Sequence, residues 1–440
     1  MRRGAVAAFV VIGLALAGCG AAALTDSGSL SVQATPSTLP QSLTAARPIT
    51  STLRTTGGLS TGQVAVADGE TARLGASVPD PSSAPDTRLG PALPKPAGPA
   101  WPTAKGDVAV TPGPVNVYSH ITGPNLSPAV ADVPLRAYVP NSDAGTVSVI
   151  DPATMKVIDR FAVGIRPHHV TPSWDLSKLY VNNTESNTLT VIDPRSGKPT
   201  GTIPITDPYN LYFTPDGSKA IVVAERFQRL DFYDAGNWNF IKSVSIPWPG
   251  VDHADFSADG RYFLASTEFS GQVVKVDTET MTYVGKAEVG GLPIDVKLSP
   301  DGAVLYVANQ GRNGVSIVDV ESMTEVGFLK TGAGAHGLNV SRDAATLYVS
   351  NRMEGSVSVI DFATRTVRET WKVGGSPDMI QVSADGSQLW VSNRFQGSVS
   401  VIDTATGKVT ATVATGAGAH GISLFPQPGR FNVGHNGVYR

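Results

Sequence analysis

A repeat of about 42 residues constrains the fold of this chain more than any other feature. An aspartate ends an alternating apolar run seven times, and successive aspartates lie 41 to 43 residues apart: Asp151, Asp193, Asp234, Asp277, Asp319, Asp361 and Asp403. Seven marks at one period indicate seven copies of a single supersecondary unit. Two of these copies, starting at Asn351 and Asn393, are nearly identical in sequence.

Each copy has the pattern of four short strands. Within residues 293–335, apolar segments at 294–298, 305–308, 314–319 and 325–330 are separated by turns rich in Gly, Pro and Asp. The third segment alternates with period two, as a half-buried strand does, and no helical period of ten or more residues occurs in the repeats. Four antiparallel strands in each of seven units predict an all-β, seven-bladed β-propeller.

The ends of the repeat region indicate how the ring closes. The first unit starts with a segment, residues 135–141, that matches the second strand of the other units. The last apolar segment, residues 420–425, matches a first strand. We therefore expect the N- and C-terminal strands to share one blade, which would remove two exposed sheet edges.

The N-terminus has the features of an export signal. Arg2 and Arg3 precede an apolar stretch over residues 5–17, which is too short to span a bilayer. The following Leu16-Ala17-Gly18-Cys19 resembles the bacterial lipobox, in which the cysteine carries the lipid. We predict a signal peptide over 1–18 and an extracytoplasmic protein anchored to the bacterial cell membrane through Cys19. An ordinary signal with an unmodified cysteine is the alternative.

Composition divides the rest of the chain and limits its partners. Residues 19–114 are rich in Ser, Thr, Pro and Ala and predict a disordered tether, followed by a lead-in segment (115–133), the propeller (134–426) and a C-terminal tail (427–440). The formal net charge of −3 gives no basic face for nucleic acid. The single cysteine excludes an intrachain disulfide, a zinc finger and Cys-X-X-Cys-His haem attachment. We expect a monomer.

The second strands carry a motif that resembles the YVTN family of β-propellers. It occurs at 137–141, 179–183, 305–309, 347–351 and 389–393, whereas 220–225 and 263–268 depart from it. The resemblance covers residues 134–426 and implies the fold. It is poorly specific for function, because similar repeats occur in the copper-bearing propeller of nitrous oxide reductase, the haem d1 domain of cytochrome cd1 nitrite reductase, lactonases and streptogramin lyases.

The openings of the first strands form two polar rings around the expected channel. The two rings contain five of the seven histidines together with three aspartates: His168, His169, Asp252, His253, Asp295, His336, Asp378 and His420. Imidazole and carboxylate groups that converge suit a metal ion, for which His336, Asp378 and His420 are the candidate ligands. The alternative is a wet channel mouth whose side chains bond to loop amides and water. His120 and His435 are left without a role.

Three arginines occupy matching turns on the same face: Arg226, Arg352 and Arg394. Converging guanidinium groups suit a carboxylate- or phosphate-bearing ligand, and solvated turns with Arg–Glu pairs are the alternative. The sequence thus favours a non-catalytic binding or scaffold propeller that uses this face for a small ligand or a protein partner. A divalent-metal or haem-d1-type cofactor protein, or a lyase- or lactonase-like enzyme, is the competing hypothesis. No catalytic residue is assigned.

Overall fold

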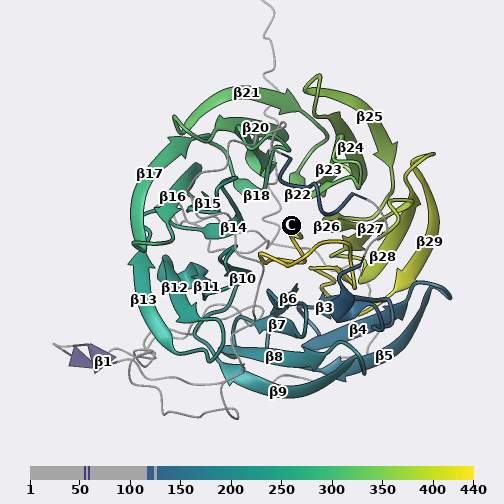
Figure 1. Ribbon diagram of the computed structural model, residues 1–440, viewed down its shortest axis with the longest axis horizontal. Coiled ribbons are helices and arrows are strands. Elements are labelled where there is room, and N and C mark those ends of the chain that lie inside the picture. The colour runs from purple at the N-terminus through teal and green to yellow at the C-terminus, as the bar shows by residue number, and fades with distance from the viewer. Residues whose placement is uncertain (1–53, 56–57, 60–115, 123–125) are drawn as a thin grey trace, which may run out of the picture. The chain divides into compact units, whose positions relative to one another are not determined.

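The computed structural model describes residues 54–55, 58–59, 116–122 and 126–440. The expected signal peptide, Cys19 and most of the tether lie outside the described residues. The short strands β1 (Arg54–Thr55) and β2 (Gly58–Leu59) pair with each other. Residues 126–440 form a ring of seven four-stranded antiparallel sheets (Figure 1). None of the described residues belongs to a helix that is both long enough and apolar enough to cross a bilayer.

The seven sheets follow one another along the chain, and one is completed by the C-terminal strand. The first three are β30 (Ser423–Phe425) with β3 (Arg136–Asn141), β4 (Thr146–Asp151) and β5 (Lys156–Ala162); β6 (Pro167–Pro172), β7 (Leu179–Asn183), β8 (Thr188–Asp193) and β9 (Lys198–Pro204); and β10 (Asn210–Phe213), β11 (Lys219–Ala224), β12 (Arg229–Asp234) and β13 (Phe240–Ser245). The next two are β14 (Val251–Phe256), β15 (Tyr262–Thr267), β16 (Gln272–Asp277) and β17 (Thr282–Glu288); and β18 (Pro293–Leu298), β19 (Val304–Asn309), β20 (Gly314–Asp319) and β21 (Thr324–Lys330). The last two are β22 (Ala335–Val340), β23 (Thr346–Asn351), β24 (Ser356–Asp361) and β25 (Thr366–Lys372); and β26 (Pro377–Val382), β27 (Gln388–Asn393), β28 (Ser398–Asp403) and β29 (Lys408–Ala414).

The prediction of a seven-bladed propeller is confirmed. First strands lie nearest the centre of the ring and fourth strands form its rim (Figure 1). Burial follows this order: every residue of β26 is buried, whereas most residues of β25 on the rim are exposed. Three single-turn 3-10 helices, η2 (Pro128–Val130), η3 (Glu225–Phe227) and η4 (Gln310–Arg312), are the helical elements among the described residues.

The asparagine of the repeated motif ties the second strand to the third. In β23, Nδ2 of Asn351 donates to the hydroxyls of Ser356 and Ser358, each 3.0 Å away. The pair Ser398 and Ser400 receives the same two bonds from Asn393. A short amide at this position therefore fixes the turn from inside the blade. This accounts for the asparagine of the motif by its role in the fold.

The expected ring closure is also confirmed. Strand β30 pairs antiparallel with β3, with Ala137 opposite Leu424 and Tyr138 opposite Ser423. Neighbouring blades are joined through polar side chains of their first strands. The carboxylate of Asp255 accepts the amide of Leu298 at 3.0 Å, and the side chain of Gln381 accepts the amide of Leu424.

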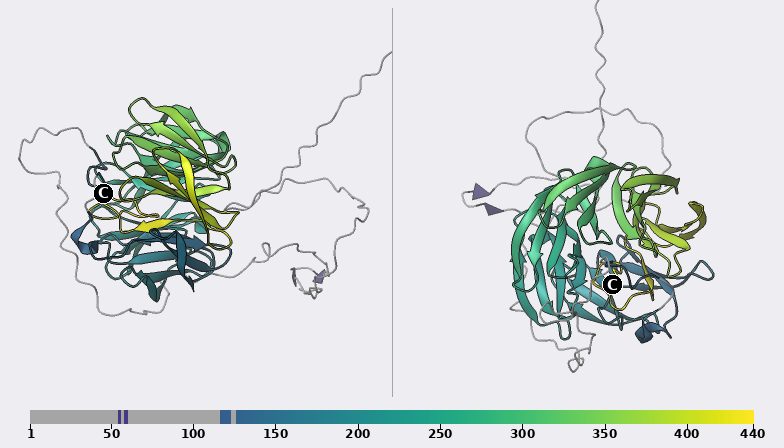
Figure 2. Two further views of the ribbon diagram at one scale, coloured as in Figure 1. Left: turned by 90° about the vertical axis from the view of Figure 1, so that its right-hand side faces the viewer. Right: turned by 45° about the horizontal axis from the view of Figure 1, so that its top comes forward.

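The C-terminal tail forms a hairpin inside the channel. Val433 N–H donates to the carbonyl of Val438, and Gly437 N–H donates to the carbonyl of Gly434, so the hairpin tip is His435-Asn436. One arm extends the inner edge of β10, because Phe213 N–H donates to Val433 O. In Figure 1 this segment (yellow) crosses the middle of the ring, and in Figure 2 the C-terminus lies at one face.

A buried ion pair holds the end of this hairpin. Arg440 contacts Oδ1 of Asp255 at 2.6 Å, and its guanidinium lies 4.7 Å from the ring centre of Tyr118 in the lead-in segment. The two side chains of the ion pair are 9% and 0% exposed. The tail is thus packed into the core of the propeller.

Candidate functional site

Six of the seven histidines form one buried cluster in the channel of the propeller. We call this group, His168, His169, His253, His336, His420 and His435, the histidine chamber; each member is at most 6% exposed. Its rings are neighbours: the ring centres of His169 and His435 are 4.6 Å apart, and those of His253 and His435 are 4.5 Å apart. His120, the seventh histidine, is exposed and lies in the lead-in segment.

Five of these histidines belong to the repeats, and the sixth belongs to the C-terminal tail. His168 and His169 lie on β6, His253 on β14 and His336 on β22, while His420 precedes β30. Because equivalent positions of first strands face one axis, the period of the sequence makes their side chains converge. His435 lies at the tip of the C-terminal hairpin.

Three of the six have ligand atoms close enough together to share a metal ion. One ring nitrogen each of His169, His253 and His435 lies within 4.8 Å of the other two, and no other group of His, Cys, Asp or Glu does so among the described residues. All three side chains are buried. We call these residues the histidine triad.

Each triad member has an oxygen acceptor next to Nδ1. Nδ1 of His169 lies 3.1 Å from Oδ1 of Asn436, and Nδ1 of His435 lies 3.1 Å from Oδ1 of Asn210. Nδ1 of His253 lies 2.7 Å from a carboxylate oxygen of Asp252. An amide oxygen carries no proton, so Nδ1 is the donor in the contacts of His169 and His435, and Nε2 of these neutral rings keeps its lone pair. The contact of His253 with Asp252 is an ion pair by distance and lacks hydrogen-bond geometry.

Several buried polar atoms in the chamber have no hydrogen-bond partner. They include Nε2 of His169, Nε2 of His253 and both ring nitrogens of His420. Nε2 of His435, in contrast, lies 3.2 Å from Nδ2 of Asn436. Each buried polar group without a partner costs about 1–3 kcal/mol, and such groups in a folded protein are often explained by an ion or ligand.

Asp378 is the centre of a second cluster beside the triad. Its Oδ1 lies 2.5 Å from Arg352 and 2.9 Å from Nδ1 of His336, and its Oδ2 lies 3.9 Å from both Arg394 and Nε2 of His420. The predicted ligand set His336, Asp378 and His420 is therefore brought together. The carboxylate of Asp378 already has a guanidinium partner in Arg352, and the same guanidinium also contacts Nε2 of His336.

The electrostatics of the two clusters differ. Burial lowers the pKa values of His169 and His435 well below the usual range, so both rings are neutral at pH 7. Burial acts the same way on His253, but the charge of Asp252 outweighs it and raises the pKa of this ring. Burial by itself would raise the pKa of Asp378, but Arg352, His336 and Arg394 hold it well below the usual range.

Glu268 is a further buried acidic residue near these charges. It is 5% exposed, and burial together with the neighbouring carboxylates of Asp252 and Glu225 raises its pKa well above the usual range. The side chain is therefore biased toward the neutral acid. A neutral carboxyl group can both donate and accept a hydrogen bond, which suits a polar ligand.

Two candidate residues from the sequence pair with groups other than the chamber histidines. Arg226 is 47% exposed and pairs with Asp207 at 2.5 Å, so it does not join Arg352 and Arg394 at Asp378. Asp295 accepts Lys297 Nζ at 3.1 Å and the amide of Leu338 at 2.8 Å, which connects two blades.

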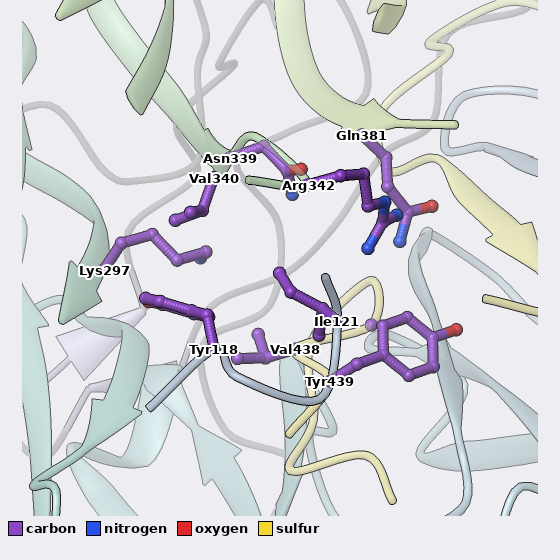
Figure 3. Close-up of a pocket in the computed structure, with 10 residues that line it drawn as sticks. Tyr118, Ile121, Lys297, Asn339, Val340, Arg342, Gln381, Val438 and Tyr439 are labelled. Carbon is purple, nitrogen blue, oxygen red and sulfur yellow. The ribbon is translucent and has the colours of Figure 1, made fainter. Parts of the chain in front are cut away.

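A cavity of about 30 Å³ lies where the tail and the lead-in segment meet (Figure 3). Its lining includes Tyr118, Lys297, Arg342, Gln381 and Tyr439. Arg342 donates to the carbonyls of Ser383 and Val382, both at 2.8 Å. The volume corresponds to one or two water molecules, so we interpret it as a hydrated structural void.

Sequence reasoning missed the role of His435 and Asn436, because neither belongs to the repeat. The available signal was the order Gly434-His435-Asn436-Gly437, a short polar tip between glycines. Both glycines have positive φ, 134° and 118°, a conformation that favours residues without Cβ. A Cβ on Gly434 would also lie 2.5 Å from Tyr212.

Fold and site together define a seven-bladed β-propeller with a histidine-rich channel closed by its own C-terminal hairpin. A family model described as YNCE-like beta-propeller matches residues 109–428, and the chain belongs to this family. No curated protein matches the chain.

Solved structures resemble the chain in fold. A functionally unknown protein from Desulfotomaculum acetoxidans DSM 771 has a TM-score of 0.59 at 21% identity and covers 67% of this chain and 99% of its own. Hydrazine synthase of Kuenenia stuttgartiensis has a TM-score of 0.52 at 19% identity, covering 58% and 88%. Dihydro-heme d1 dehydrogenase NirN in complex with DHE has a TM-score of 0.52 at 16% identity, covering 65% and 74%.

The histidine chamber does not fit a haem-type macrocycle. The ring of His420 lies 5.0 Å from that of His168 and 4.9 Å from that of His169, so imidazoles fill the space between these strands. A planar macrocycle would need an open slot in their place. The chamber instead suits an ion or a small polar molecule.

Proposed function

We propose that this chain is an extracytoplasmic, membrane-anchored binding protein that takes a small polar ligand or an ion into the histidine chamber. The observation that carries the proposal is the concentration there of buried polar atoms without partners, above all those of His169, His253 and His420. A purely structural core would satisfy these atoms or replace them with apolar groups. The membrane anchor through Cys19 and the outer location are part of the proposal.

Buried charged side chains lie beside the chamber. Arg352 and Arg394 are 6% and 5% exposed, and Asp378 lies between them. An anionic ligand could form charge-assisted hydrogen bonds with these guanidinium groups in addition to their contacts with Asp378. We therefore expect the ligand to contact both the Arg–Asp–His cluster and the neighbouring imidazoles.

Purification of the full chain from its native membrane tests this proposal. Native mass spectrometry and elemental analysis would identify a bound species, and thermal unfolding would be measured against metal ions, phosphate and dicarboxylates. We expect at least one of these ligands to raise the unfolding temperature, since a ligand that binds only the folded state stabilises it.

A matched pair of variants locates the binding. Arg394→Met should weaken the stabilisation, whereas Arg226→Met, at the equivalent turn but outside the chamber, should leave it unchanged. If no species copurifies and no compound in the panel stabilises the chain, the proposed function is wrong.

A further inference from the structure

We propose that the histidine triad, His169, His253 and His435, is a binding site for a divalent transition metal such as Zn²⁺ or Cu²⁺, completed by the C-terminal hairpin. This inference rests on the proposed function and names the ligand class of the same chamber. The triad draws on two first strands and on the tail, so the intact ring and the docked hairpin are both required.

The ligand atoms support this assignment. One ring nitrogen of each histidine lies within 4.8 Å of the other two, and Nε2 of His169 and Nε2 of His253 lack any hydrogen-bond partner. Nε2 of His435 now contacts Nδ2 of Asn436 at 3.2 Å, and the ion would replace that contact. Three imidazoles at about 2.0–2.1 Å form a common zinc site with an open fourth position.

The oxygen atoms beside the three rings match those that orient the histidine ligands of known metal sites. A metal-bound imidazole almost always donates its other N–H to a carboxylate, a carbonyl or water, which fixes the ring and raises its basicity. Here Asp252, Asn436 and Asn210 supply one such oxygen for each of the three rings.

The ligand type selects the metal. Nitrogen donors favour Zn²⁺, Cu²⁺, Ni²⁺ and Fe²⁺, whereas Ca²⁺ and Mg²⁺ require oxygen ligands. His420 is the adjacent side chain, with its ring 4.9 Å from that of His169 and neither nitrogen hydrogen-bonded. It is placed to reach the fourth position directly or through a bound water.

The site must contract slightly on binding. The ligand atoms lie within 4.8 Å of one another, whereas tetrahedral coordination brings nitrogens to about 3.3 Å. Gly434 and Gly437 flank the tip that carries His435, and they provide the local backbone freedom for this shift. Metal binding would thereby draw the hairpin tip further into the chamber.

The test is titration calorimetry on the full chain after chelator treatment, with Zn²⁺ and Cu²⁺ and with Mg²⁺ and Ca²⁺ as controls. We expect one transition metal ion per chain and no saturable binding of the control ions. His169→Ala, His253→Ala and His435→Ala should each lower the affinity by about 100-fold or more, and Asn436→Ala by about 10-fold.

Two histidine variants serve as matched controls. His168→Ala removes a buried imidazole of the same chamber whose Nδ1 bonds to Thr184, and His120→Ala removes an exposed one. Both should change the affinity by less than about 3-fold, because neither residue belongs to the triad. Electron paramagnetic resonance of the Cu²⁺ form should show coupling to imidazole nitrogens that His435→Ala reduces.

A variant that preserves the local hydrogen bond distinguishes loss of metal binding from loss of the fold. His435→Asn keeps an N–H donor near the position of Nδ1 for Asn210 but has no Nε2, so it should fold and still fail to bind. Absence of saturable binding, or unchanged affinity in His435→Asn, would overturn the metal site. If phosphate or a dicarboxylate stabilises the chain while metals do not, the proposed function stands and the metal inference fails.

Discussion

The closing strand gives the sharpest prediction about stability. Leu424 in β30 is completely buried, faces Ala137 across the strand pair and belongs to the same apolar cluster as Ile150 of β4. Truncating a buried leucine removes its transfer free energy and leaves a cavity, which costs about 2–5 kcal/mol. We expect Leu424→Ala to lower the free energy of unfolding by about 3 kcal/mol, in the middle of that range.

The same blade offers a matched control. Leu135 immediately precedes β3 and is 41% exposed, so Leu135→Ala deletes the same atoms from a half-solvated position. Its expected cost is within about 0.5 kcal/mol, as for most surface substitutions. Urea unfolding of the full chain measures the cost of both substitutions. If the free energy of unfolding depends equally steeply on urea concentration in the two variants, the denatured state is unchanged.

The comparison can refute the closure argument. Equal costs for Leu424→Ala and Leu135→Ala, or a cost below about 1 kcal/mol for the first, would mean that β30 contributes little to the ring. Separate transitions for one blade and the rest would mean that closure does not make the ring unfold as a unit.

Three further predictions concern the membrane anchor, the C-terminal hairpin and Asp378. Cys19→Ala should release the protein from membranes or block its processing in cell fractionation, and unchanged membrane binding with unchanged mobility would contradict the anchor. Arg440→Met should cost about 3–5 kcal/mol in urea unfolding by leaving Asp255 buried without its ion-pair partner; addition of Asp255→Asn should cost less than the sum of the two single changes. Asp378→Asn should destabilise the chain at pH 7, because the folded-state pKa of Asp378 lies below its unfolded value and its ionised form therefore stabilises the fold. This contribution is lost as pH falls below about 3.9 toward the lowered pKa, so the difference from the parent should shrink there and should not grow.

The repeat allowed most of the fold to be predicted from the sequence. Alternating apolar residues and turns that contain an aspartate recur with a period of about 42, so each copy forms the same local structure. The strands expected at 294–298, 305–308, 314–319 and 325–330 correspond to β18, β19, β20 and β21 within one residue at each end. Local propensity and tertiary packing agree in every blade, which is why the pattern sufficed.

Only part of the candidate site could be predicted from the sequence. Periodicity placed His168, His169, His253, His336 and His420 on one axis, and all five lie in the chamber. Periodicity could not distinguish Arg226, whose side chain turns to Asp207, from Arg352 and Arg394, which turn to Asp378. Equivalent positions share a backbone environment, but each long side chain pairs with whichever charge its own neighbours provide.

The sequence by itself determined the number of blades, the strand order, the closure of the ring and the gathering of histidines at one end of the channel. Each of these follows from the repeat, because copies of one unit must bury equivalent faces against one another. Only the tertiary structure decided that residues 430–440 fold back as a hairpin and bring His435 and Asn436 to His169 and His253. The tail has no counterpart in the repeat, and its position depends on long-range contacts, such as Arg440 with Asp255, between residues far apart in the sequence.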